Sequence, residues 1–200
     1  MIDTSSADAA LREECTQSRE LLRGRLLHVF ADEVRLPDGR LTQREYIRHP
    51  GAVAIIPLLE GADGSVQLVM ERQFRYPVGR AVLEFPAGKR DAGEEPLACA
   101  QRELREETGY TARQWARAGQ LHPTVAYSTE SIDIWFARGL QRGERALDVG
   151  EFLDVLTVTP GELLAACRDG LVTDSKTLVG ALWLQNVLGG VWTLDWQDAP

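Results

Sequence analysis

The stretch GKRDAGEEPLACAQRELREETGY, residues 88–110, decides the fold of this 200-residue chain. It follows an apolar run, VLEFPA at residues 82–87, which predicts a strand. Pro96 suits the first turn of a helix, and Gly109 suits the position just after its end. The pattern therefore predicts a strand, a glycine-containing loop and a helix over about residues 95–108.

Three glutamates, Glu103, Glu106 and Glu107, lie three and four residues apart on this expected helix. Their side chains should therefore lie on one face of the helix. Like charges at this spacing oppose helix formation by about 0.2–0.5 kcal/mol per pair. Arg102 can pair with Glu106, and a divalent cation can offset more of the repulsion. Carboxylate oxygens select a hard ion, so we predict bound Mg²⁺, with Mn²⁺ as an alternative. For the short string RELREE alone, a solvated charged helix face is the other interpretation.

The stretch resembles the signature of the Nudix hydrolase family, G-x5-E-x7-R-E-U-x-E-E-x-G-U, in which U is a bulky apolar residue. Every fixed position is filled, and Leu104 and Tyr110 occupy the two apolar places. The resemblance implies an α/β fold, the Nudix α/β/α sandwich with a mixed sheet. It also implies Mg²⁺-dependent attack of water on the pyrophosphate bond of a nucleoside diphosphate linked to another group.

Other segments resemble the branch that hydrolyses ADP-ribose and nucleoside-diphosphate sugars. These segments are QFR at residues 73–75, LEFPAG at 83–88, GEFLDV at 150–155 and TDSKTL at 173–178. The resemblance implies a nucleotide-sugar substrate, cut to a nucleoside monophosphate and a sugar phosphate. The chain has HPTVAYSTE, residues 122–130, where these enzymes commonly carry a Ser-Pro-Gly turn, so the preference for ADP-ribose itself stays open.

Two further functions also stay open. One is a Nudix-fold protein that senses or regulates through a nucleotide without cleaving it. The other is a Nudix hydrolase of nucleoside triphosphates or dinucleoside polyphosphates. The complete carboxylate set favours an enzyme, because binding alone needs no general base.

The resemblance suggests a role for individual residues. The expected metal ligands are the carbonyl of Ala87 and the carboxylates of Glu103, Glu106 and Glu107. The expected substrate-binding residues are Arg75, Glu84, Arg44 and Glu45. The expected catalytic residues are Glu106, Arg102 and Glu151. Candidate platforms for stacking the base are Tyr76, Tyr127 and Trp135, for which burial in the core is the alternative.

The general base is the least determined of these roles. In the branch it often lies two positions before the Glu of GEFLDV, and here that position holds Val149. The alternatives are a loop acid, namely Asp148, Glu151 or Glu130, or a carboxylate of the helix. We favour Glu106, because a helix fixes geometry better than a loop does.

The composition predicts a cytoplasmic protein. The formal net charge is −8, which gives no basic surface for nucleic acid. Cys15, Cys99 and Cys167 lie far apart and are expected to be reduced thiols. Neither a signal peptide nor an apolar stretch of membrane-spanning length is visible, so no membrane partner is expected.

The chain divides into four expected segments. Residues 1–24 are a tail, partly disordered or with a short helix over residues 10–22, and residues 25–48 are a hairpin around PDGR at 37–40. In the branch such N-terminal strands pair across a homodimer, where Arg44 and Glu45 would reach the partner's substrate site. A charged exposed edge strand is the alternative for these two residues. The Nudix catalytic domain covers residues 49–190. Within it we expect buried strands at residues 51–60 and 66–74, further strands near 131–137 and 152–158, and helices over about 160–168 and 174–188. Residues 191–200 are a C-terminal tail.

Overall fold

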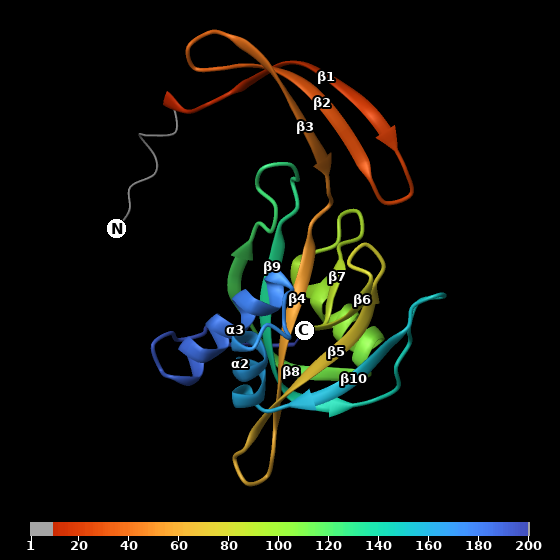
Figure 1. Cartoon of the computed structure of the whole chain (residues 1–200). Coiled ribbons are helices and arrows are strands. Elements are labelled where there is room, and N and C mark those ends of the chain that lie inside the picture. Colours follow the sequence, from red (N-terminus) through yellow and green to blue (C-terminus); the bar gives the residue numbers. More distant parts are fainter. Residues whose placement is uncertain (1–9, 200) are drawn as a thin grey trace. The chain divides into compact units, whose positions relative to one another are not determined.

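The structure is a computed structural model, and it describes residues 10–199 of the chain. The chain forms two compact units (Figure 1). The first unit consists of Met1–His49 with Thr124–Glu130, and the second of Pro50–Pro123 with Ser131–Pro200. The disorder predicted for the first residues falls on positions 1–9, which lie outside the described range.

The first unit is a three-stranded antiparallel sheet in the order β1-β2-β3. Strands β2 (His28–Arg35) and β3 (Leu41–Arg48) form the predicted hairpin, paired from His28 with Arg48 to Arg35 with Leu41. Gly39 takes a positive φ of 86° in the turn, a conformation that glycine adopts without strain. The N–H of Ile47 also donates to the carbonyl of Tyr127, which ties the segment 124–130 to this sheet.

Strand β1 (Glu14–Arg23) corrects the predicted tail or short helix. It pairs antiparallel with β2, and the hydroxyl of Ser18 donates to Asp32 across the pair. All ten residues of β1 are exposed, so no alternation of buried and exposed side chains identifies the strand in the sequence. Its conformation is set by backbone pairing with β2, the central strand of the sheet.

The second unit contains a mixed sheet in the order β10-β5-β4-β9-β8-β11. Its strands are β4 (Ala52–Glu60), β5 (Val66–Arg75), β6 (Arg80–Glu84), β7 (Ala87–Lys89), β8 (Tyr110–Leu121), β9 (Ile132–Arg142), β10 (Leu153–Val158) and β11 (Gln197–Asp198). Strands β4 and β9 are parallel, whereas the other pairs are antiparallel. The predicted strand 82–87 is divided at Phe85 and Pro86, with β6 pairing with β5 and β7 with β4.

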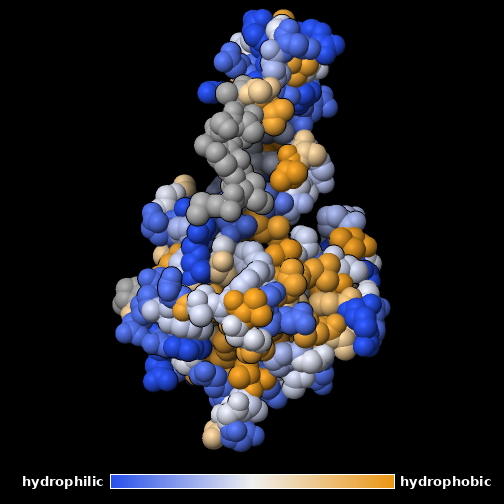
Figure 2. All heavy atoms as spheres, turned by 90° about the vertical axis from the view of Figure 1, so that its left-hand side faces the viewer, coloured by the Kyte–Doolittle hydropathy of each residue, from blue (hydrophilic) through white to orange (hydrophobic). Residues whose placement is uncertain are grey.

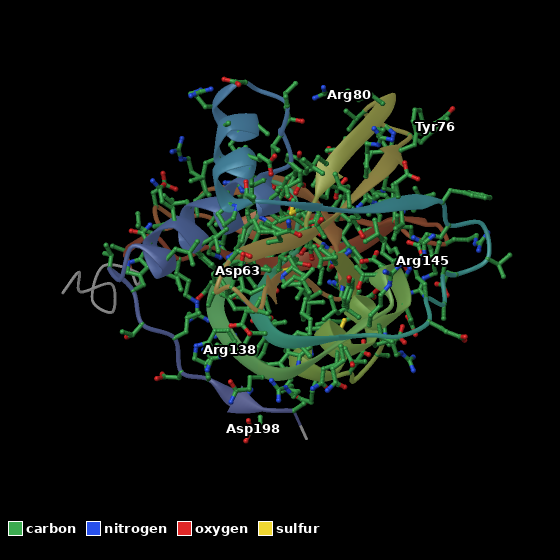
Figure 3. All side chains as sticks on the ribbon, turned by 90° about the horizontal axis from the view of Figure 1, so that it is seen from below. Asp63, Tyr76, Arg80, Arg138, Arg145 and Asp198 are labelled. Carbon is green, nitrogen blue, oxygen red and sulfur yellow. The ribbon has the colours of Figure 1, made fainter. Side chains whose placement is uncertain are left out.

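Helices cover both faces of this sheet, as the sandwich requires. They are α1 (Pro96–Glu103), the π-helical turn η2 (Leu104–Thr108), α2 (Pro160–Arg168) and α3 (Ser175–Leu188). Val53 and Ile55 of β4 pack with Leu104, whereas Ala54 and Ile56 pack with Leu163 and Leu184. Successive residues of a strand point to opposite faces, so these two clusters form two cores. Figure 3 shows α1 and the pair α2 and α3 on opposite sides of the strands, which confirms the α/β/α arrangement.

The two C-terminal helices begin and end close to the predicted positions. Thr159 accepts from the N–H of Glu162 and forms a capping box with it, and Asp174 caps α3 by accepting from the N–H of Thr177. Figure 2 shows apolar surface on the side where α2 and α3 lie; Leu178 and Leu182 are exposed residues of α3. Within residues 10–199, no helix is long and apolar enough to cross a membrane.

Candidate active site

The signature helix is not a uniform α-helix. Pro96 starts it as predicted, but after Glu103 the helix continues as the π-helical turn η2. Gly109 ends this turn with a positive φ of 77°, and its N–H donates to the carbonyl of Arg105. Turns of this kind are rare and often occur at functional sites. The predicted helix over about residues 95–108 is therefore confirmed in extent, and its last turn is π-helical.

Arg102 holds three carboxylates of the signature together. Its Nε and Nη2 donate to Glu94 at 2.9 Å each, and its Nη1 donates to Glu103 at 2.8 Å and to Glu106 at 3.2 Å. The hydrogen bonds from Arg102 lower the pKa of Glu94 to about 2. Arg102 thus orients the acidic side chains, in the contact that the sequence predicted with Glu106.

Glu107 is the most buried carboxylate of the signature. Its side chain is buried, with 3% exposure, and one of its oxygens accepts from the N–H of Ala87 at 3.0 Å. Burial raises the pKa of Glu107, and the charges of Glu71 and Glu103 raise it further. Glu107 nevertheless stays close to Glu103, because the charge of Glu103 acts on its pKa and the two side chains contact the adjacent residues Ala87 and Gly88.

Glu71, which the sequence analysis did not select, lies beside Glu107. It belongs to β5, is 0% exposed, and neither of its oxygens accepts a hydrogen bond from an N–H or a hydroxyl group among residues 10–199. Burial raises the pKa of Glu71; a hydrogen bond with the carboxyl group of Glu107 opposes this, and the charge of Glu84 adds to it. The available signal was a single charged residue continuing the apolar run Leu68–Met70, in a strand expected to be buried.

Gly88 brings the backbone against Glu103. A Cβ atom at this position would overlap the carboxyl group of Glu103. Burial raises the pKa of Glu103, although the neighbouring guanidinium of Arg102 lowers it. Only glycine leaves room for this carboxylate beside the loop.

These residues suit a hard divalent cation. Their donors are all oxygen atoms, the carboxylate of Glu71 is buried without an N–H or hydroxyl partner, and Gly88 leaves space beside Glu103. Within residues 10–199, no three His, Cys, Asp or Glu side chains already converge as ligands. The reason is visible in the contacts: Arg102 holds Glu103 and Glu106, and the N–H of Ala87 holds Glu107.

Arg75 and Glu84, both predicted to bind substrate, meet on the β5–β6 pair. Arg75 donates to the two oxygens of Glu84 at 2.7 and 2.8 Å. Lys176 of α3, which the sequence analysis missed, also donates to Glu84 and lies 3.1 Å from Asp174. Burial alone would raise the pKa of Glu84, but these cationic partners hold it below its usual value. The structure therefore ties the predicted substrate residues into a buried ion-pair network.

Glu151 lies near the acidic group, in the loop before β10. Its charge contributes to the raised pKa values of Glu103 and Glu107. One oxygen accepts from the side chain of Gln73 at 3.3 Å, and the other accepts from the N–H of Asp148 at 3.4 Å. Val149 is fully exposed. Glu106, by contrast, accepts from two guanidinium groups, those of Arg102 and Arg105.

Three of the predicted charged residues belong to the first unit. Arg44 forms a two-contact ion pair with Glu13 at 2.6 and 2.9 Å, and Glu45 is exposed on β3. Glu130, the third, is half-buried in the segment 124–130. Their roles stay predictions.

The three aromatic candidates differ in burial. Tyr76 is exposed and follows β5 at the turn to β6, where Figure 3 shows it pointing outward. Tyr127 is exposed in the first unit, whereas Trp135 is buried in the core between the sheet and α1. Trp135 is thus a core residue, and only the two tyrosines are accessible to a ligand.

A cavity of about 720 Å³ lies between η2 and β10. It is lined by residues of the turn, of β10 and of the loop after β9, and the loop contributes Arg145 (Figure 3). Arg142 at the end of β9 adds a second guanidinium. None of the predicted site residues lines this cavity. Thr108, which does line it, directly follows Glu107 in the sequence.

Comparisons with known proteins agree with this geometry. Residues 48–177 match the NUDIX domain, and residues 13–47 match the nucleoside diphosphate sugar hydrolase N-terminal domain. The chain is 38% identical over 196 residues to the ADP-ribose pyrophosphatase of Mycobacterium tuberculosis, covering 94% of this chain and 92% of the relative. It is 35% identical over 175 residues to the methanol dehydrogenase activator of Bacillus methanolicus, covering 86% and 92%.

A solved structure described as an ADP compounds hydrolase has the same fold. It superposes with a TM-score of 0.79 at 21% identity and covers 90% of this chain and 96% of its own. The similarity extends through both units and supports the fold alone. Because the signature, the sandwich and the domain match all agree, the chain belongs to the Nudix family.

Proposed function

We propose that this protein hydrolyses the pyrophosphate bond of ADP-ribose-like or sugar nucleotides and requires a divalent metal ion. The observation that carries the proposal is the acidic group itself, with Glu103 beside Gly88 and Glu107 buried against Ala87. The similarity to an ADP-ribose pyrophosphatase and the match of residues 13–47 support the substrate class. Release of a nucleoside monophosphate and a sugar phosphate is the expected outcome.

The ligands that we propose for Mg²⁺, or for Mn²⁺, are the carbonyl of Ala87 and the carboxylates of Glu103 and Glu107, with Glu106 as a further candidate. When bound, such a cation neutralises phosphate oxygens and makes a water molecule more acidic. Arg102 keeps Glu103 and Glu106 in place, which reduces the reorganisation needed on binding. Arg75, half-exposed beside Glu84, is the residue that we propose for contact with the diphosphate.

For the proton acceptor, the contacts favour Glu151 over Glu106. A base needs a carboxylate oxygen free to take a proton from water. Both oxygens of Glu106 accept from guanidinium groups, at 3.2 and 3.3 Å. Glu151 has a neutral amide and a backbone N–H as its donors, at 3.3 and 3.4 Å. We therefore propose Glu151, and this reverses the preference drawn from helix geometry alone.

We further propose a homodimer through the first unit. This three-stranded sheet exposes large apolar side chains, among them Leu21, Leu22, Leu27 and Leu41. A small sheet without a covering helix has little core of its own, so a second copy would stabilise it. In such a dimer, Arg44 and Glu45 would serve the partner's substrate site.

We propose a cytoplasmic location, because Cys15, Cys99 and Cys167 are all free thiols. Nucleic acid is not a proposed partner, since the net charge is −8.

A second candidate function is regulation of a partner enzyme. The 35% identity to a protein described as a methanol dehydrogenase activator favours it specifically. A regulator of this kind would bind a nucleotide sugar tightly and turn it over slowly or not at all.

Product chromatography with a nucleotide panel separates these functions. The panel contains ADP-ribose, other nucleoside-diphosphate sugars, nucleoside triphosphates and dinucleoside polyphosphates, each with Mg²⁺. We expect AMP and ribose 5-phosphate from ADP-ribose, and slower release from the last two classes. Preferential cleavage of triphosphates, or binding of ADP-ribose without cleavage, would overturn the proposal.

A further inference from the structure

Glu71 is the least satisfied acidic group in residues 10–199. Both of its carboxylate oxygens are buried and accept no hydrogen bond from an N–H or a hydroxyl group, so that the carboxyl group of Glu107 is their one hydrogen-bonding neighbour, and the side chain is 0% exposed. Among the side-chain polar atoms of this range, only the indole nitrogen of Trp135 shares that state. Proteins rarely bury a carboxylate unless it is paired or binds a metal ion. The position therefore requires an explanation.

The cationic side chains around Glu71 are already bound to other acids. Arg75 donates through two nitrogens to Glu84, and Lys176 contacts Glu84 and Asp174. Within the described part of the chain, no cation of the protein makes a hydrogen bond or ion pair with Glu71.

A neighbouring acidic side chain, Glu107, makes the burial of a charged Glu71 more costly. Glu107 reaches the same place from η2, and it is also buried, with a single hydrogen bond from the N–H of Ala87. Two buried carboxylates repel each other unless they share a proton or a cation. They come from two separate elements, β5 and η2, and the peptide of Ala87 lies beside them. Oxygen donors from several elements around one point suit Mg²⁺ or Mn²⁺.

We infer that Glu71 is a further ligand of the divalent cation bound at Glu107, contributed by β5 and additional to the signature residues. This inference rests on the proposed function, since it assumes that the acidic group binds a metal ion. It places the cation toward the buried side of η2, where Glu71 and Glu107 face each other. The charge of the cation would then satisfy both carboxylates.

The test measures Mn²⁺ affinity without nucleotide, from the electron paramagnetic resonance signal of free Mn²⁺. Loss of a residue that only supports a metal ligand typically weakens metal binding about 10- to 100-fold. Loss of a direct ligand should cost at least as much, so Glu71→Gln should raise the Kd for Mn²⁺ at least about tenfold. Glu60→Gln, at an exposed position at the end of β4, is the matched control and should bind Mn²⁺ as the unchanged protein does. In chelator, Glu71→Gln should melt at the same or a higher temperature, because a buried unpaired charge is gone.

The outcomes are distinct. A Kd of Glu71→Gln within twofold of the unchanged protein, while Glu107→Gln binds weakly, overturns the inference and leaves the proposed function intact. A lower midpoint in chelator together with unchanged Mn²⁺ affinity would assign Glu71 a structural role, and this also overturns it. Failure of the unchanged protein to bind Mn²⁺ overturns both. If Glu71→Gln does not fold, Glu71→Met, of similar volume, is measured in its place.

Discussion

Replacement of Gly88 by alanine adds one methyl group at the centre of the site. Gly88 has a backbone conformation that alanine can adopt, so the effect comes from space alone. The new Cβ would overlap the carboxyl carbon and both oxygens of Glu103. That carboxylate also accepts from Arg102 at 2.8 Å, and its side chain is mostly buried. It cannot move without breaking this contact.

The size of the effect follows from the overlap. Relief of the clash requires a displacement of Glu103 of about 1 Å or more, and a misplacement of 1 Å can cost about 10²-fold in rate. We therefore expect kcat/KM for ADP-ribose to fall at least about 100-fold. Overpacking costs about 1–3 kcal/mol, which lowers the melting midpoint by about 2–12 °C and leaves the protein folded at 25 °C.

Gly161→Ala is the matched control for this variant. A Cβ at Gly161, in the first turn of α2, meets only the hydroxyl of Thr159 at 4.0 Å. This change should keep full activity and stabilise the protein by about 0.4–1 kcal/mol. Activity of Gly88→Ala within threefold of the unchanged protein, measured by AMP release, would refute the placement of Glu103 beside the loop.

Three further expectations concern metal, base and assembly. Saturating Mg²⁺, at about 100 times its Kd, should stabilise the native state by about 2.7 kcal/mol and raise the midpoint by about 5–10 °C; an unchanged midpoint would count against a metal site. Glu151→Gln should lose about 10²–10⁴-fold in turnover at saturating Mg²⁺, and Glu106→Gln less; the opposite order would restore Glu106 as the base. Light scattering at micromolar concentration should show a dimer; an active monomer would remove the roles of Arg44 and Glu45 across the interface.

Local signals in the sequence predicted much of the fold. Pro96 and Gly109 mark the ends of the signature helix, and Pro160 and Asp174 mark the starts of α2 and α3. The hairpin of β2 and β3 follows from its turn residues. Each of these features depends on residues that are neighbours in the chain. Strands β1 and β8 were not predicted. All residues of β1 are exposed and most residues of β8 are exposed or half-buried, so neither sequence carries a clear alternation of apolar and polar residues.

The acidic group was predicted in part, for a physical reason. The spacing of Glu103, Glu106 and Glu107 suggests a metal site, but no local residue pattern marks the π-helical turn or the burial of Glu107 within it. Glu71 and Lys176 could not be assigned from spacing. Their importance comes from burial beside Glu107 and Glu84, and only the tertiary structure brings these residues together.

The most direct measurement of the central claim follows ADP-ribose by chromatography with the unchanged protein and with Glu107→Gln. With Mg²⁺, the unchanged protein should release equal amounts of AMP and ribose 5-phosphate, and a chelator should stop the reaction. Glu107→Gln keeps the side-chain volume but loses the charge, so its rate should fall by two or more orders of magnitude, about 3 kcal/mol or more in activation free energy. Turnover by Glu107→Gln near the normal rate, or undiminished turnover in chelator, would contradict a metal-dependent site at the buried carboxylates.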